Sequence, residues 1–130
     1  MWTDHCEQTG DSGFPQDLVV DEENDVVFEK GTNDYTDGYS PFFDNTGRIS
    51  TGLGEILQDN GIEDIVLVGI AFDYAIRYAA NHAKNLGYDV SVIADASAVI
   101  DQQVALDTTT EMIANKVSIL SSDDIIKMEC

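Results

Sequence analysis

Apolar and polar positions follow a regular rhythm in the second half of the chain. Short β-branched runs, which are typical of buried strands, alternate with longer stretches whose apolar residues recur at helical spacing. The segments predicted in chain order are a strand at 65–69, a helix at 73–86, a strand at 90–94, a helix at about 104–115, a strand at 117–120 and a short helix at 121–127. This alternation predicts an α/β fold, with three α/β/α layers around a mostly parallel sheet.

The first half of the chain is dominated by loop-forming residues. The segments expected there are an ordered loop with short strand pieces over 1–25, a strand at 26–29 that ends at Lys30, a loop at 31–47 and a helix at 53–59. The long loop, rich in Gly, Asn and Asp, is of the functional rather than the connecting kind. The length of 130 residues suits a single domain over 1–130.

Acidic residues outnumber basic ones by 25 to 6, which gives the chain a formal net charge of −19. Such a surface repels phosphate backbones, so the composition excludes nucleic-acid binding. The acids are dispersed along the chain, which favours adaptation to concentrated salt, with a merely acidic domain as the alternative. The sequence contains no apolar run of about eighteen residues and begins unlike a signal peptide, so we expect a cytoplasmic, halophilic protein without a membrane span.

The junction between the strand at 65–69 and the next helix carries the strongest chemical signal. Gly69 ends the strand, and Asp73 is suited to cap the helix that follows. A strand-to-helix turn of this kind directs backbone N–H groups and the positive end of a helix dipole at one spot above the sheet edge. A thiolate or an oxyanion would be stabilised there. The position that would present such a nucleophile is Ala75, which has no nucleophilic atom.

Four ordered motifs resemble the nicotinamidase/pyrazinamidase branch of the isochorismatase-like cysteine hydrolases. The matching residues are Gly69-Ile70-Ala71 with Asp73-Tyr74-Ala75, similar to the family's VGxAxDxC; Trp2-Thr3-Asp4-His5-Cys6 with Thr9-Gly10 and Phe14, similar to WPxHC…GT; Phe28-Glu29-Lys30-Gly31 with Gly38-Tyr39-Ser40 and Phe42, similar to KG…YSxF; and Thr51-Gly52-Leu53 with Leu57 and Gly61-Ile62. The resemblance spans nearly the whole chain. It implies an isochorismatase-like fold and the hydrolysis of nicotinamide to nicotinate and ammonia.

The resemblance also implies roles for particular residues. Lys30 matches the family lysine beside the nucleophile, although a lysine at a strand end also suits a solvated terminus. Ala71 matches a backbone donor of the oxyanion hole, and Ala75 stands at the position of the nucleophilic cysteine. The substrate-binding positions are Trp2, Tyr39 and Tyr74, whose rings suit stacking on a pyridine but equally suit a core or a surface.

His5 matches one ligand of the family's divalent metal, which is zinc, iron or manganese. The family's other ligands, its first strand and its aspartate base precede this motif, so we expect the chain to be truncated at its N-terminus, to lack that strand and to bind no metal. Cys6 follows the metal-binding histidine without attacking substrate in the family pattern, and His82 is expected to be an ordinary helix residue.

The expected function is therefore a nicotinamidase-like amidohydrolase domain that is inactive as the chain stands. A pseudoenzyme or gene remnant with a binding or partner role is one alternative, and an isochorismatase-like ether hydrolase is another. A small molecule of the nicotinamide type is the expected ligand. A homo-oligomer or a complementing N-terminal fragment is the protein partner that these expectations leave open.

Overall fold

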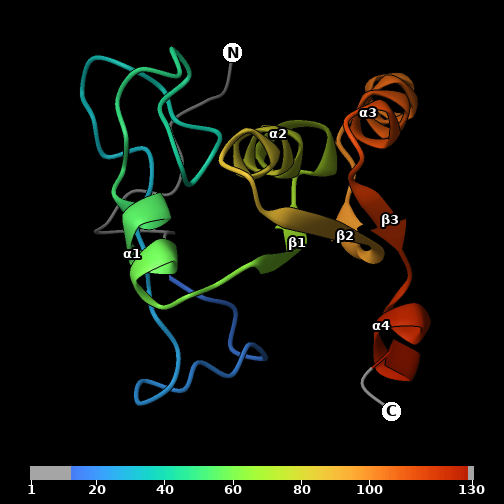
Figure 1. Cartoon of the computed structure of the whole chain (residues 1–130), viewed down its shortest axis with the longest axis horizontal. Coiled ribbons are helices and arrows are strands. Elements are labelled where there is room, and N and C mark those ends of the chain that lie inside the picture. The colour runs from blue at the N-terminus through green and yellow to red at the C-terminus, as the bar shows by residue number, and fades with distance from the viewer. Residues whose placement is uncertain (1–12, 129–130) are drawn as a thin grey trace.

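Three parallel strands form one sheet in the second half of the chain (Figure 1). In the computed structural model, which describes residues 13–128, the strands are β1 (Asp64–Ile70), β2 (Asp89–Ala98) and β3 (Ser118–Leu120). They pair in the order β1-β2-β3. Each strand therefore lies beside the strand that precedes or follows it in the chain. The predicted α/β fold with a parallel sheet is confirmed.

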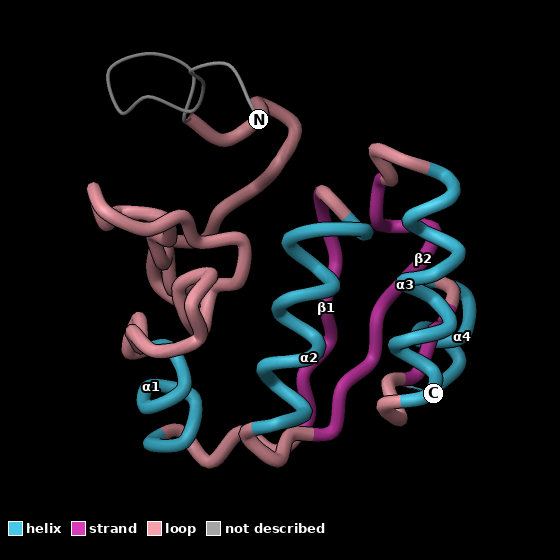
Figure 2. The backbone as a smooth tube through the Cα atoms, turned by 90° about the horizontal axis from the view of Figure 1, so that it is seen from above, coloured by secondary structure: helices cyan, strands magenta, loops and turns pink. Residues whose placement is uncertain are grey.

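Two helices cover one face of this sheet. They are α2 (Arg77–Asn85) and α3 (Gln102–Ala114), and both lie in front of the strands in Figure 2. A short helix, α4 (Ser122–Met128), lies on the other side of the sheet near β3. The side chain of Asp101 accepts hydrogen bonds from the backbone N–H groups of Gln103 and Val104 at 2.9 and 3.2 Å, which explains why α3 starts earlier than expected.

The core lies between the sheet and the α2–α3 layer. Ala80 and Ala83 on α2 are completely buried, so this helix approaches β1 and β2 closely. From the sheet and α3, Val92 and Met112 are also completely buried. The burial of these side chains is the main favourable term holding α2 and α3 on the strands.

The other face of β1 is open in the described part of the chain. Ile65 and Leu67 pack against the core, whereas Val66, Val68 and Ile70 are 51%, 55% and 75% exposed. The β-branched run had predicted a buried strand, whereas among the described residues only one face of β1 is covered. The alternation arises because α2 covers one face of β1 and no described element covers the other.

The first half contains little regular structure. Residues 13–52 form loops and turns, apart from an isolated antiparallel bridge between Phe43 and Ser50. The strand expected at 26–29 is absent, and Val26 and Val27 are 74% and 57% exposed. A strand requires a hydrogen-bonded neighbour, and no described segment pairs with this one. Helix α1 (Leu53–Asp59) confirms the predicted helix, which ends where Gly61 adopts a φ of 67°.

Candidate functional site

The site is built around the turn that follows β1. Ala71 precedes a π-helical turn, η1 (Phe72–Ile76), in which the N–H of Ile76 donates to the carbonyl of Ala71 at 3.0 Å. The peptide bond between Ile70 and Ala71 is cis. Ala71 is buried, whereas Ala75 is partly exposed. The wide turn thus presents position 75 at the carboxyl end of β1, where parallel sheets carry their sites.

Asp73 has a different role from the one its position in the sequence suggested. It was expected to cap the helix, but no side-chain cap bond exists at the start of η1, and Asp73 is completely buried within it. Its carboxylate accepts hydrogen bonds from the backbone N–H groups of Ile100 at 3.2 Å and Asp101 at 2.8 Å. Asp73 therefore ties the turn to the segment that joins β2 to α3.

An irregularity in β2 brings the segment that joins β2 to α3 close to the turn after β1. Leu67 pairs with Val92, but two residues later Gly69 pairs with Ser97, so β2 carries extra residues between these pairs. The displaced part of β2 includes Asp95, whose carboxylate accepts from the N–H and the hydroxyl of Ser122 at 2.8 and 2.6 Å. Asp95 therefore anchors α4.

Lys30 reaches the site through a close crossing of two loop segments. A Cβ atom on Gly38 would lie 3.3 Å from the Cα and N atoms of Gly31, so position 38 favours glycine. Gly31 also has a φ of 68°, which only glycine adopts readily. At this crossing the Nζ atom of Lys30 donates to the carbonyl of Gly38 at 3.1 Å.

These elements enclose a pocket of about 350 Å³. Its lining comprises Lys30, Gly31, Asn33, Thr36, Asp37, Gly38, Tyr39, Ile70, Ala71, Tyr74, Ala75 and Ile100. Five positions that the sequence had singled out therefore line one pocket. The combination of two phenol rings, one ammonium group and a small apolar floor can hold a flat aromatic ligand that carries a polar oxygen. The sequence did not predict that residues in the range 33–37 contribute to the pocket, because loop residues carry no periodic signal.

Tyr39 and Tyr74 form the aromatic part of the lining. Their ring centroids are 5.7 Å apart and their planes are tilted by 57°. Tyr39 also contacts the ring of Tyr78, with centroids 5.4 Å apart. The position of Tyr39 therefore depends on how the loop at 31–52 rests on η1 and α2.

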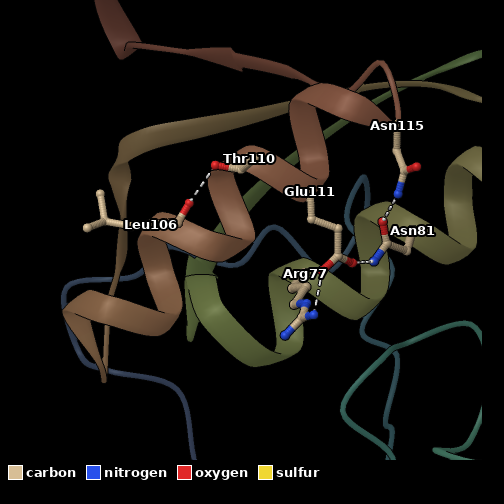
Figure 3. Close-up of polar contacts among 6 residues, drawn as sticks. All are labelled: Arg77, Asn81, Leu106, Thr110, Glu111 and Asn115. Carbon is tan, nitrogen blue, oxygen red and sulfur yellow. Dashed lines mark hydrogen bonds and ion pairs between the residues drawn. The ribbon is translucent and has the colours of Figure 1, made fainter.

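A polar cluster joins α2 to α3 (Figure 3). Arg77, the first residue of α2, forms an ion pair with Glu111, and the side-chain amide of Asn81 donates to the same carboxylate at 2.6 Å. Asn115 donates to the side-chain oxygen of Asn81 at 3.0 Å. The hydrogen bond from Arg77 lowers the pKa of Glu111 and raises the pKa of Arg77. The cluster fixes the start of α2 directly after η1.

Two of the predicted site residues, Trp2 and His5, lie outside the described residues. Within residues 13–128 no group of three or more His, Cys, Asp and Glu side chains is arranged to hold a metal ion. A larger cavity, of about 700 Å³, lies between α1 and the turn from α2 to β2, and none of the predicted site residues lines it. None of the described helices has the length and apolar character that crossing a membrane requires.

Comparison with known proteins gives a consistent picture. The family model for the isochorismatase domain matches residues 2–124. A nicotinamidase of Escherichia coli is 38% identical over 95 residues, which cover 73% of this chain and 45% of the relative. A nicotinamidase of Acinetobacter baylyi is 33% identical over 128 residues, which cover 97% of this chain and 59% of the relative. The chain therefore spans about half the length of these curated relatives.

Solved structures match the fold closely. A nicotinamidase/pyrazinamidase of Acinetobacter baumannii superposes with a TM-score of 0.89 at 31% identity, covering 96% of this chain and 61% of that one. The pyrazinamidase of Pyrococcus horikoshii in complex with zinc superposes with a TM-score of 0.80 at 27% identity, covering 93% of this chain and 63% of that one. PnC1 of L. infantum in complex with nicotinate superposes with a TM-score of 0.65 at 30% identity, covering 68% of this chain and 44% of that one.

Proposed function

The chain belongs to the isochorismatase family, and on this premise we propose that it is a nicotinamidase-like amidohydrolase domain that binds a nicotinamide-type ligand without hydrolysing it. The observation that carries the proposal is the pocket of about 350 Å³ that joins Lys30, Tyr39 and Tyr74 to the η1 turn. The nicotinamidase relatives and the nicotinate complex of the L. infantum protein support the ligand class.

The proposed binding uses each part of the pocket for one feature of the ligand. The rings of Tyr39 and Tyr74 would contact the faces or edges of a pyridine ring. The ammonium group of Lys30 would attract the amide oxygen of nicotinamide or the carboxylate of nicotinate. Zinc, which the Pyrococcus neighbour holds, has no set of ligands among residues 13–128, and the contacts proposed here are those of the pocket side chains.

The absence of hydrolysis follows from the chemistry of Ala75. An amidase of this family type forms a covalent bond between its nucleophile and the carbonyl carbon, for which the attacking atom must offer an electron pair. The Cβ atom of Ala75 has none. The backbone of the turn remains able to donate hydrogen bonds to a carbonyl oxygen, because its N–H groups do not depend on the side chain at 75.

Titration calorimetry with nicotinamide and nicotinate tests the binding. We expect Tyr74→Leu to weaken binding about two- to thirteenfold, the range given by an aromatic contact of about 0.5–1.5 kcal/mol. The matched control is Tyr35→Leu, because Tyr35 is 94% exposed and does not line the pocket. Equal affinities in both variants, or no binding by the unaltered chain, would contradict the proposal. Ammonia release that disappears in Lys30→Ala would show that the domain hydrolyses its ligand.

A second candidate function is the binding of a protein partner at β1. This strand lies at the edge of the sheet in the described part of the chain, and its residues Val66, Val68 and Ile70 are exposed on its open face. An open edge with apolar side chains can accept another strand. Sedimentation measurements with the unaltered chain and with Val68→Lys test this role. If both proteins are monomers, β1 does not bind a second copy of this chain. Binding of a different chain would then be tested by co-purification from the native host.

A further inference from the structure

A row of rings attaches the loop at 31–52 to η1 and α2. Tyr74, Tyr78 and His82 are four residues apart, so they occupy one face of the helical segment. Tyr39 contacts Tyr74 and Tyr78, with centroid separations of 5.7 and 5.4 Å. Phe43 meets His82 edge-on at 5.1 Å. The loop therefore rests on the helix through two rings of its own, at positions 39 and 43.

His82 is the member of this row that can gain a charge near neutral pH. Its Nδ1 atom is buried and has no hydrogen-bond partner among residues 13–128, and its ring lies against Phe43 and Tyr78. In the neutral imidazole, Nδ1 can be the nitrogen without a hydrogen, so burial leaves only a lone pair unsatisfied. Protonation would place an N–H donor and a positive charge at that buried position, which is costly.

The groups that face His82 come from two elements. Asp44, on the loop, favours the charged imidazole, but its carboxylate already accepts hydrogen bonds from Thr46, Arg48 and Ile49. Tyr78, on α2, adds a phenol ring. Burial outweighs the attraction to Asp44 and lowers the pKa of His82 below its ordinary value of 6.5.

We propose that His82 is a pH-sensitive attachment point for the loop at 31–52, and that its protonation releases the wall of the ligand pocket that Tyr39 forms against Tyr74. The inference rests on the proposed function, because it concerns the regulation of the same pocket. The direction of the pH dependence follows because the attached loop favours the neutral form of His82. Attachment is complete above pH 6.5 and weakens as the pH falls below this value. The pKa of His82 differs between the attached and the released loop. Each unit of this difference corresponds to about a tenfold change in the equilibrium constant for attachment.

Hydrogen–deuterium exchange of the full chain tests the release directly. Exchange of peptides from 36–52, corrected for the intrinsic pH dependence, is compared at about pH 7.5 and pH 5 with that of peptides from 89–98. We expect the loop of the unaltered chain to lose protection at the lower pH. In His82→Phe, which keeps a ring without a titrating group, the loop should stay protected. A pH response in His5→Ala that equals the response of the unaltered chain excludes the other histidine. Equal pH responses in the unaltered chain and His82→Phe would overturn the proposal.

A second measurement covers the case in which His82→Phe does not fold. In an NMR titration of the unaltered chain, the ring signals of His82 and Tyr39 should change with one common midpoint below pH 6.5. Independent midpoints, or a Tyr39 ring that does not respond, would overturn the inference. Nicotinamide affinity measured over the same range separates the two proposals. Loss of loop protection without nicotinamide binding at any pH would retain the attachment point and reject the proposed ligand.

Discussion

The carboxylate of Asp73 accepts the backbone N–H of Asp101 at 2.8 Å across 28 residues of sequence. Because Asp73 lies in η1 and Asp101 caps α3, this bond connects the site turn to the start of a helix on the same face of the sheet. A second bond, from the N–H of Ile100 at 3.2 Å, completes the connection. The shape of the pocket near Ile100 therefore depends on a carboxylate that never meets solvent.

Replacing this carboxylate should destabilise the fold strongly. In Asp73→Ala two backbone N–H groups lose a charged acceptor, and hydrogen bonds to charged groups contribute about 1.5–3 kcal/mol each. We expect the free energy of unfolding in urea to fall by about 3–6 kcal/mol, the sum for the two bonds. Asp59→Ala is the matched control, because Asp59 is exposed at the end of α1. A loss of the same size in both variants would contradict this role for Asp73.

The ion pair between Arg77 and Glu111 should contribute modestly and in a pH-dependent way. Both side chains are about one-third exposed, at 35% and 33%, so solvent screening limits the contribution to below about 1 kcal/mol. The pKa of Glu111 is lowered in the folded state from 4.5. Its contribution is therefore present above pH 4.5 and is lost as the pH falls through the folded-state pKa.

Chemical denaturation of Glu111→Gln between pH 7 and pH 3 measures this contribution. The unaltered chain should be more stable at neutral pH, and the difference should shrink below about pH 4.5. Lys84→Gln, which removes the more exposed pair with Asp89, serves as the control and should change stability less. A pH-independent difference would indicate that packing of the Glu111 side chain, rather than its charge, accounts for the effect.

A thiol introduced at the turn should be unusually acidic. In Ala75→Cys, with Cys6 and Cys130 replaced by Ser, the new sulfur would line the same pocket as the ammonium group of Lys30. We expect the pH profile of alkylation by iodoacetamide to have its midpoint below the ordinary thiol pKa of about 8.5. Adding Lys30→Gln should move the midpoint upward. A midpoint near 8.5 in both variants would show that Lys30 does not influence position 75.

The net charge of −19 should make stability depend on salt. Repulsion among the dispersed carboxylates destabilises the compact state at low ionic strength, and screening removes it. We expect the thermal midpoint to rise steeply between dilute buffer and molar potassium chloride. Equimolar tetramethylammonium chloride separates general screening from any specific effect of potassium. A flat midpoint in both salts would remove the argument for adaptation to concentrated salt.

Local pattern predicted the second half of the fold well and the first half poorly. The strands near Ile65, Val90 and Val117 and the helices between them follow from periodicity, because each element buries one side against its sequence neighbours. The run at 26–29 has the same β-branched character but no described partner. Strand formation depends on an edge elsewhere in the molecule, which a local pattern does not report.

The candidate site was likewise predictable from the sequence only in part. Motif resemblance identified Lys30, Tyr39 and Tyr74, which the structure brings to one pocket together with the turn. The use of Asp73 was not predictable from its neighbours, because a polar residue before a helix usually caps that helix. Its carboxylate instead accepts hydrogen bonds from backbone N–H groups 27 and 28 residues away. Only the path of β2 past the turn determines that contact.

The order of the strands has a consequence for how the protein is made. Because β2 pairs with β1 and β3 pairs with β2, both β2 and β3 meet a partner strand that has already been synthesised when they leave the ribosome. The sheet grows at one edge, and no pair of strands has to separate to admit a later one. Parallel ladders of this kind close slowly when a whole chain refolds from denaturant, since every strand searches at once. During synthesis from the N-terminus, β1, α2 and β2 emerge in the order in which they pack, so the strands do not have to find one another all at once.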